Sequence, residues 1–152
     1  MRLQDKIPQS ALRCLISLDA LLDGLDPSLR KDIALFEKRL RVLPNKIVFD
    51  SNDQPLHIYV HSTGKVALFK DSELKDIILA CPAGPKCIYG LVEALSGTPY
   101  ALTMKTLSDS EFNVIDRDKL VVLIKNHPAL CFRLAEILCR LYQHAVHTIK
   151  SH

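Results

Sequence analysis

Residues 89 to 106, YGLVEALSGTPYALTMKT, have the outline of a phosphate-binding loop but lack its charged side chains. Gly90 precedes a short apolar stretch that is expected to be helical, and the free amide groups at the start of a helix attract anions. Glu93 is the only acid in the stretch, and no lysine or arginine occurs between Ile88 and Met104. A buried phosphate would therefore depend on backbone amides alone, without a charge-assisted hydrogen bond.

The chain contains an odd number of cysteines without any Cys-x-x-Cys spacing: Cys14, Cys81, Cys87, Cys131 and Cys139. Such a set predicts reduced thiols packed as small apolar side chains, and it argues against a zinc site or a disulfide framework. Cys81 and Cys87 flank the loop PAGPK and are the candidates for a thiol redox switch. A switch would need an exposed thiol of lowered pKa.

Haem ligation is an alternative use of Cys81 and Cys87. The dipeptide Cys81-Pro82 occurs in haem-responsive motifs, and His144 and His147 lie about one helical turn apart near the C-terminus. Thiolate and imidazole both serve as axial ligands of haem iron. Because Cys-Pro is common in turns and exposed histidines are usually solvated, a structural role for these residues is the simpler interpretation. Haem is kept as the alternative.

His57 and His61 are expected on the same face of a strand, as metal ligands in some jelly-roll enzymes are. At about 3.3 Å per residue they stand roughly 13 Å apart, too far to share one ion. The sequence has no His-x-His pair, nucleophile elbow, dinucleotide-binding glycine motif or metalloprotease helix. It predicts neither a metal site nor an enzyme.

The composition predicts one ordinary globular domain. The chain has 152 residues, of which 48% are apolar and 24% charged, with a formal net charge of +3. The basic residues are dispersed, whereas a nucleic-acid-binding surface normally concentrates them on one face. The N-terminus lacks the apolar core of a signal peptide, and no run is long enough to span a membrane. A cytoplasmic protein with no membrane contact is expected.

Three zones of different periodicity position these residues. Residues 1–41 are expected to form an N-terminal helical segment, in which Asp26 and Pro27 start a second helix. Residues 42–118 alternate short β-rich runs with turn sequences, which predicts a jelly-roll core. Residues 119–152 are expected to form C-terminal helices. The predicted fold class is a mainly β jelly roll (a double-stranded β-helix) with N-terminal helices and a long C-terminal dimerisation helix, one domain overall.

An apolar stripe runs along the last predicted helix at alternating spacings of three and four residues. It comprises Cys131, Leu134, Leu138, Leu141, Ala145 and Thr148. Such spacing is typical of a helix that pairs with another helix. We expect the stripe to form the seam of a homodimer; the alternative is that it packs on the chain's own β-barrel.

The order of these zones resembles the cyclic-nucleotide-binding-type sensor domain of the catabolite-activator/FNR (CRP/FNR) regulator superfamily, over roughly residues 12 to 150. The resemblance rests on LLDGLDPSLRKDIA, IVFDSNDQPLHIYVHSTGKVALF, AGPKCIYGLVEAL and TMKTLSDSEFNVIDRDKLVVLIKNHPAL. Asn45 and Asn52 stand where such domains usually have glycine, and asparagine tolerates the left-handed backbone of those turns. The resemblance implies a homodimer that contacts DNA only through a following domain, not present in this chain.

The resemblance also implies where a ligand would bind. In nucleotide-binding members, a Phe-Gly-Glu-Leu-Ala motif and a later arginine hold the ribose and the cyclic phosphate. On this chain Tyr89 and Gly90 match the start of that motif, while Leu91 replaces the glutamate. The arginine position falls at or next to Tyr100, just before Ala101. Both polar ligands of the nucleotide are therefore missing.

Contacts to the base are expected to be missing as well. The Thr-Ser pair that touches the adenine in the catabolite activator corresponds approximately to His144 and Ala145. Glu93 could replace the missing acid only if the register slipped by two residues. The predicted pocket residues are Tyr89, Gly90, Leu91, Glu93, Tyr100, Ala101 and His144.

The sequence thus predicts the sensor and dimerisation domain of a CRP/FNR-like transcriptional regulator that does not bind cAMP or cGMP in the usual way. Its effector is not identified. The alternatives are a stand-alone interaction module with a collapsed pocket, a sensor of haem or another small ligand, a thiol redox sensor, and a cyclic-nucleotide binder in a slipped register.

Overall fold

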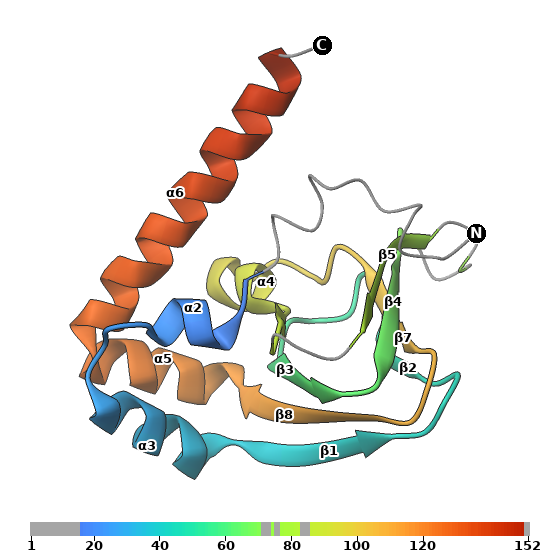
Figure 1. Cartoon of the computed structure of the whole chain (residues 1–152), viewed down its shortest axis with the longest axis horizontal. Helices are drawn as coiled ribbons and strands as arrows, with labels where there is room; N and C mark the ends of the chain where they lie inside the picture. Colours follow the sequence, from blue (N-terminus) through green and yellow to red (C-terminus); the bar gives the residue numbers. More distant parts are fainter. Residues whose placement is uncertain (1–15, 71–73, 75–76, 83–85, 151–152) are drawn as a thin grey trace.

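The computed structural model describes residues 16–70, 74, 77–82 and 86–150. Two four-stranded antiparallel sheets, with strand orders β1-β8-β3-β6 and β2-β7-β4-β5, form the β part of the chain. Helices cover one end of the sheets, and a long C-terminal helix extends beyond them (Figure 1). This architecture confirms the predicted jelly roll with its N-terminal helices and long last helix.

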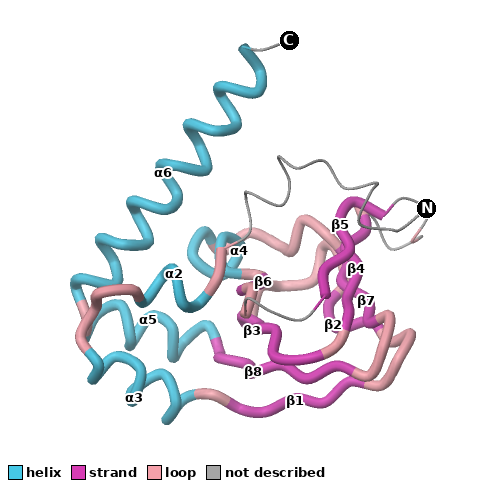
Figure 2. The backbone as a smooth tube through the Cα atoms, viewed as in Figure 1, coloured by secondary structure: helices cyan, strands magenta, loops and turns pink. Residues whose placement is uncertain are grey.

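The strands are β1 (Lys38–Val42), β2 (Ile47–Phe49), β3 (His57–Thr63), β4 (Lys65–Phe69), β5 (Ile77–Pro82), β6 (Ile88–Tyr89), β7 (Thr103–Thr106) and β8 (Ser110–Asp116). The helices are α2 (Leu18–Leu22), α3 (Pro27–Phe36), α4 (Leu91–Ser96), α5 (Arg117–Asn126) and α6 (Pro128–Lys150). Figure 2 shows α2, α3 and α5 grouped beside the sheets, with α4 between this group and the strands of the second sheet. Of the described helices, none has the length and apolar character needed to cross a membrane.

Strand β3 separates two apolar cores. Its Tyr59 belongs to the cluster between the two sheets, whereas Ile58 and Val60 pack with the helices. Successive side chains of a strand point to opposite faces, so β3 is buried on both sides. This double burial explains why three apolar residues, Ile58, Tyr59 and Val60, follow one another in the strand.

The first strand begins at Lys38, although the helical segment was expected to extend to residue 41. Helix α3 ends at Phe36, and the N–H of Glu37 donates to the carbonyl of Ile33 at 3.0 Å. From Lys38 to Val42 the chain pairs in register with β8. The alternating charged and apolar residues of this segment suit an exposed edge strand. Residues 1–15, part of the expected first helix, lie outside the described residues.

Two turn residues have the backbone conformation expected from the sequence. Asn45 and Asn52 have φ values of 62° and 75°, in the left-handed region. Strand β7 begins only at Thr103, because Tyr100 pairs with a loop: its N–H donates to the carbonyl of Asp53 at 3.0 Å. This late start leaves Ala101 and Leu102 outside the strand, where they line the candidate site.

Candidate functional site

Gly90 lies between β6 and α4 and sets the geometry of the site. Its φ is 84°, in the left-handed region that favours glycine. A Cβ atom at this position would lie 2.9 Å from Cε1 of Tyr100 and 3.1 Å from the carbonyl oxygen of His57. The glycine therefore allows the ring of Tyr100 to pack directly against the start of α4.

Tyr100 is a buried side chain with a fixed hydrogen bond. It is 4% exposed, and its ring stacks on Phe49 with the ring centroids 4.3 Å apart. Its hydroxyl donates to the carbonyl oxygen of His57 at 2.5 Å. Burial raises the pKa of Tyr100 to about 12, so the hydroxyl stays protonated at neutral pH. A neutral ring bonded to the backbone of β3 thus occupies this candidate arginine position.

A cavity of about 240 Å³, here called the α4 cavity, lies beside Gly90. Of the predicted pocket residues, the structure brings together five along its walls: Tyr89, Gly90, Leu91, Glu93 and Ala101. Ala101, rather than Tyr100, is thus the cavity-lining residue at the arginine position. His144 is not among the described lining residues.

Glu93 is the one charged side chain among the described residues that line the α4 cavity. Burial raises its pKa, because the charged form loses hydration among apolar groups. The other described walls are apolar side chains and Gly90. The arrangement offers a negative charge where a phosphate would need a positive one.

Several cavity residues escaped the sequence analysis. Phe49 of β2 and Leu68 of β4 reach the cavity from the second sheet, and Leu141 reaches it from α6. Phe49 and Leu68 lie in apolar runs that predict buried strands, but these runs do not indicate which cavity they line. Only the pairing of strands distant in sequence brings them to α4.

Arg117 connects the cavity wall to the C-terminal helices. Its Nε donates to the carbonyl oxygen of Ala94 in α4 at 2.7 Å. Arg117 is the first residue of α5, which leads into α6. A guanidinium near the last carbonyls of a helix also interacts favourably with the helix dipole. No local sequence signal links Arg117 to α4, because the contact depends on the tertiary fold.

Helix α6 has two adjacent apolar faces. One packs on the chain's own core: Leu130 and Leu134 are buried in it, and Leu141 packs against it. The other, here called the outer stripe, comprises Cys131, Ala135, Leu138, Tyr142 and Ala145. Leu138 is half-buried and the other four are exposed. Of the seam predicted from the sequence, the structure places Leu134 and Leu141 toward the chain's own domain, and Cys131, Leu138 and Ala145 on the outer stripe.

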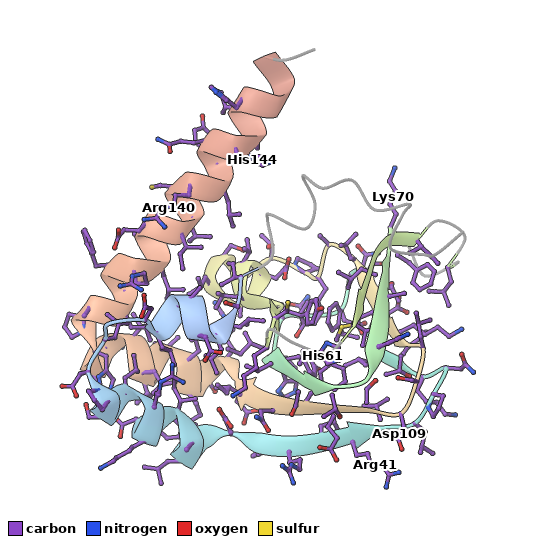
Figure 3. All side chains as sticks on the ribbon, viewed as in Figure 1. Arg41, His61, Lys70, Asp109, Arg140 and His144 are labelled. Atoms are coloured by element: carbon purple, nitrogen blue, oxygen red, sulfur yellow. The ribbon has the colours of Figure 1, made fainter. Side chains whose placement is uncertain are left out.

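The two histidines of β3 have separate partners. Nδ1 of His57 lies 2.9 Å from Oδ1 of Asp116, and Nε2 of His61 lies 3.0 Å from the carbonyl oxygen of Thr63. His61 is fully buried and stacks on Phe112, inside the β part of the molecule (Figure 3). In the described part of the chain, no three His, Cys, Asp or Glu side chains are grouped to hold a metal ion.

The cysteines have contrasting environments. Cys87 is 5% exposed in the core between the sheets, which does not suit the accessible thiol of a redox switch. The side chain of Cys81 lies outside the described residues. Cys131 and Cys139 are exposed on α6. For haem, the described residues do not bring the candidate ligands together: Cys87 is buried in the core, whereas His144 and His147 line a separate, open pocket on α6.

Solved structures of bacterial regulators share this fold. Catabolite activator protein from Thermus thermophilus superposes with a TM-score of 0.74 at 21% identity, over 86% of this chain and 62% of that protein. The sensor domain of the transcriptional regulator DNR from Pseudomonas aeruginosa gives 0.69 at 16% identity, over 83% of this chain and 85% of that domain. The chain therefore spans less than two thirds of the Thermus protein. At these identities, the likeness shows the fold alone.

A putative cyclic nucleotide-binding protein from Geobacter metallireducens has a TM-score of 0.66 at 18% identity, over 94% of this chain and 97% of that protein. No curated protein sequence matches the chain significantly. The family profile of the cyclic nucleotide-binding domain matches residues 39–127, more than half of the 152 residues. The chain belongs to the cyclic nucleotide-binding domain family.

Proposed function

We propose that this chain is a sensor and dimerisation domain of a CRP/FNR-like transcriptional regulator that does not bind cAMP or cGMP in the usual way. The observation that carries the proposal is Tyr100, buried against Gly90 with its hydroxyl on the carbonyl of His57. In this proposal the domain is not an enzyme, acts in the cytoplasm, and reaches DNA only through a further domain.

The electrostatics of the α4 cavity support this proposal. A hydrogen bond to a charged group contributes about 1.5–3 kcal/mol, so losing the arginine costs roughly ten- to more than a hundredfold in affinity. Leu91 offers no acceptor for a ribose hydroxyl, which would be desolvated without compensation. Glu93 would in addition repel the phosphate. The three effects act in the same direction.

The outer stripe supports homodimerisation. Its residues follow spacings of four and three, which keep one seam facing a partner helix over several turns. Tyr142 is 71% exposed, and Phe132 beside the stripe is 70% exposed. Large apolar side chains grouped on one exposed helix face usually mark an interface. We therefore propose that the outer stripe pairs with a second copy, while Leu134 and Leu141 hold α6 to its own domain.

Thermal unfolding with millimolar cAMP or cGMP tests the ligand proposal. A ligand present at about 100 times its Kd adds roughly 2.7 kcal/mol, which raises the Tm of a domain of this size by several degrees. We expect no shift with either nucleotide. A cyclic nucleotide-binding protein of known affinity serves as the positive control. A clear shift would contradict the proposal and indicate that Glu93 binds the ribose in a slipped register.

Size-exclusion chromatography with light scattering tests the dimer. We expect Tyr142→Glu to give a monomer at concentrations at which the unmodified chain is a dimer. Gln143→Glu is the matched control, because it adds the same charge to an exposed neighbour outside the stripe. A dimer that tolerates Tyr142→Glu as well as Gln143→Glu would refute the outer stripe as the seam.

A further inference from the structure

We propose that the α4 cavity binds a small primary amine with an apolar body, whose ammonium group pairs with the carboxylate of Glu93. The inference rests on the proposed function, because it assigns an effector class to the same pocket. The proposed function requires only that no cyclic nucleotide binds in the usual way. The amine inference requires in addition that a cation binds in the α4 cavity.

The charge of the cavity selects among ligand classes. Glu93 stands among apolar side chains, and the described lining contains no lysine, arginine or histidine. An anion would meet a like charge in a medium of low dielectric constant, where repulsion is strong. A neutral apolar ligand would further desolvate the carboxylate without pairing it. An ammonium group supplies both the opposite charge and up to three hydrogen-bond donors.

The size and walls of the cavity define the rest of the ligand. The volume is about 240 Å³. A single water needs roughly 10–15 Å³ of such volume, so this space has room for a small organic molecule with one ring and a short chain. Phe49, Leu91 and Leu102 present apolar surface to such a body. The volume and the apolar walls together fit a ligand that joins one amine to a single aromatic ring or a branched alkyl group.

The cavity also touches the elements that lead to the dimer. Leu141 of α6 lines it directly. The cavity wall α4 is bonded to Arg117 at the start of α5. A bound amine would therefore contact α6 and rest on a helix tied to α5, so ligand binding and the position of the dimer helix are physically connected.

Protonation gives the binding a characteristic pH profile. Burial raises the pKa of Glu93, so its carboxylate takes up a proton earlier than an exposed glutamate as the pH falls. An alkylammonium group has a pKa similar to that of lysine, about 10.4, and stays charged through this range. Amine affinity is therefore lost as the pH falls through the raised pKa of Glu93.

Isothermal titration calorimetry with three ligands of similar shape tests the proposal. The ligands are 2-phenylethylamine, 2-phenylethanol and phenylacetate, which are cationic, neutral and anionic at neutral pH. We expect the amine to bind, the alcohol to bind at least about tenfold more weakly, and phenylacetate to show no binding. Glu93→Gln should reduce amine affinity by roughly ten- to a hundredfold and leave the alcohol unaffected.

Two further variants complete the test. Glu111→Gln is the matched control, since Glu111 lies in β8 and is not among the described cavity residues. Ala101→Trp places a large side chain at an exposed cavity-lining position and should abolish amine binding even if Glu93→Gln fails to fold. Circular dichroism confirms that each variant is folded.

The outcomes separate the two proposals. Equal binding of phenylacetate, or no binding of 2-phenylethylamine, benzylamine and isopentylamine at millimolar concentrations, overturns the amine inference and leaves the proposed function intact. Tight binding of cAMP overturns the proposed function. Amine binding that is unchanged in both Glu93→Gln and Ala101→Trp places the amine elsewhere and also overturns the inference.

Discussion

Tyr100 and Ala101 show how much depends on the direction of one side chain. Both stand at the expected arginine position, but Tyr100 turns to the carbonyl of His57 while Ala101 lines the α4 cavity. The sequence identified the loss of the cation, because a missing residue type is visible without coordinates. It could not decide which of the two neighbours faces a ligand.

Two glycine substitutions separate backbone strain from the contact with Tyr100. Gly90 and Gly24 both have positive φ, but a Cβ on Gly24 would have no atom within 4 Å. Each alanine variant should lose about 1–2 kcal/mol from the left-handed backbone. Gly90→Ala should lose more, because its Cβ would meet Cε1 of Tyr100 at 2.9 Å. Urea unfolding measures both, and equal losses would show that the packing of Tyr100 on Gly90 contributes nothing.

Glu93 should make the stability of the domain depend on pH. Its folded-state pKa is raised above the ordinary value of 4.5, because burial disfavours the charged form. As the pH rises, Glu93 therefore stays protonated to a higher pH in the folded state than in the unfolded state. The free energy of unfolding decreases as the pH rises through the raised pKa. Glu93→Gln removes this loss. We expect the variant to gain stability relative to the unmodified chain between acidic and neutral pH, measured by urea unfolding across that range. A pH-independent difference would contradict the burial of a charged Glu93.

At the scale of elements, α6 serves the core and the surface at the same time. The sequence of α6 shows apolar residues at spacings of three and four. This spacing fits both the face that packs on the chain's own core and the outer stripe. Leu134 is 4% exposed inside the chain's own core, whereas Cys131 and Ala135 on either side of it are exposed. The packing of α6 on α2 and α5 decides between the stripes.

A truncation of Leu134 tests this division of α6. Leu134→Ala should lower the free energy of unfolding by about 2–5 kcal/mol, the usual cost of a large buried aliphatic side chain. Leu138→Ala should cost less in folding and should weaken the dimer instead. Urea unfolding and light scattering on the same samples distinguish the two effects. A Leu134→Ala variant with unchanged stability but weaker dimerisation would instead show that Leu134 lies in the dimer interface.

At the scale of the whole molecule, Cys131 on the outer stripe allows the orientation of two paired copies to be tested. In a parallel pair about a two-fold axis along α6, Cys131 faces the Cys131 of the other copy, and in an antiparallel pair it does not. We expect a copper-phenanthroline oxidant to cross-link a variant whose remaining cysteines, Cys14, Cys81, Cys87 and Cys139, are serine. Non-reducing electrophoresis measures the cross-link, and Cys131→Ser is the control. A dimer that resists cross-linking would argue for another orientation.

The sequence by itself determined the fold family and the absence of positively charged side chains from the segment that follows Tyr89. Both follow from local information: strand periodicity, turn residues such as Asn45 and Asn52, and the absence of lysine and arginine from residues 89 to 103. The tertiary structure alone decided where Tyr100 points, that Leu141 reaches the α4 cavity, and which face of α6 packs on the chain's own core. Each of these depends on contacts between segments far apart in the chain, such as Tyr100 with His57, and no local pattern encodes them.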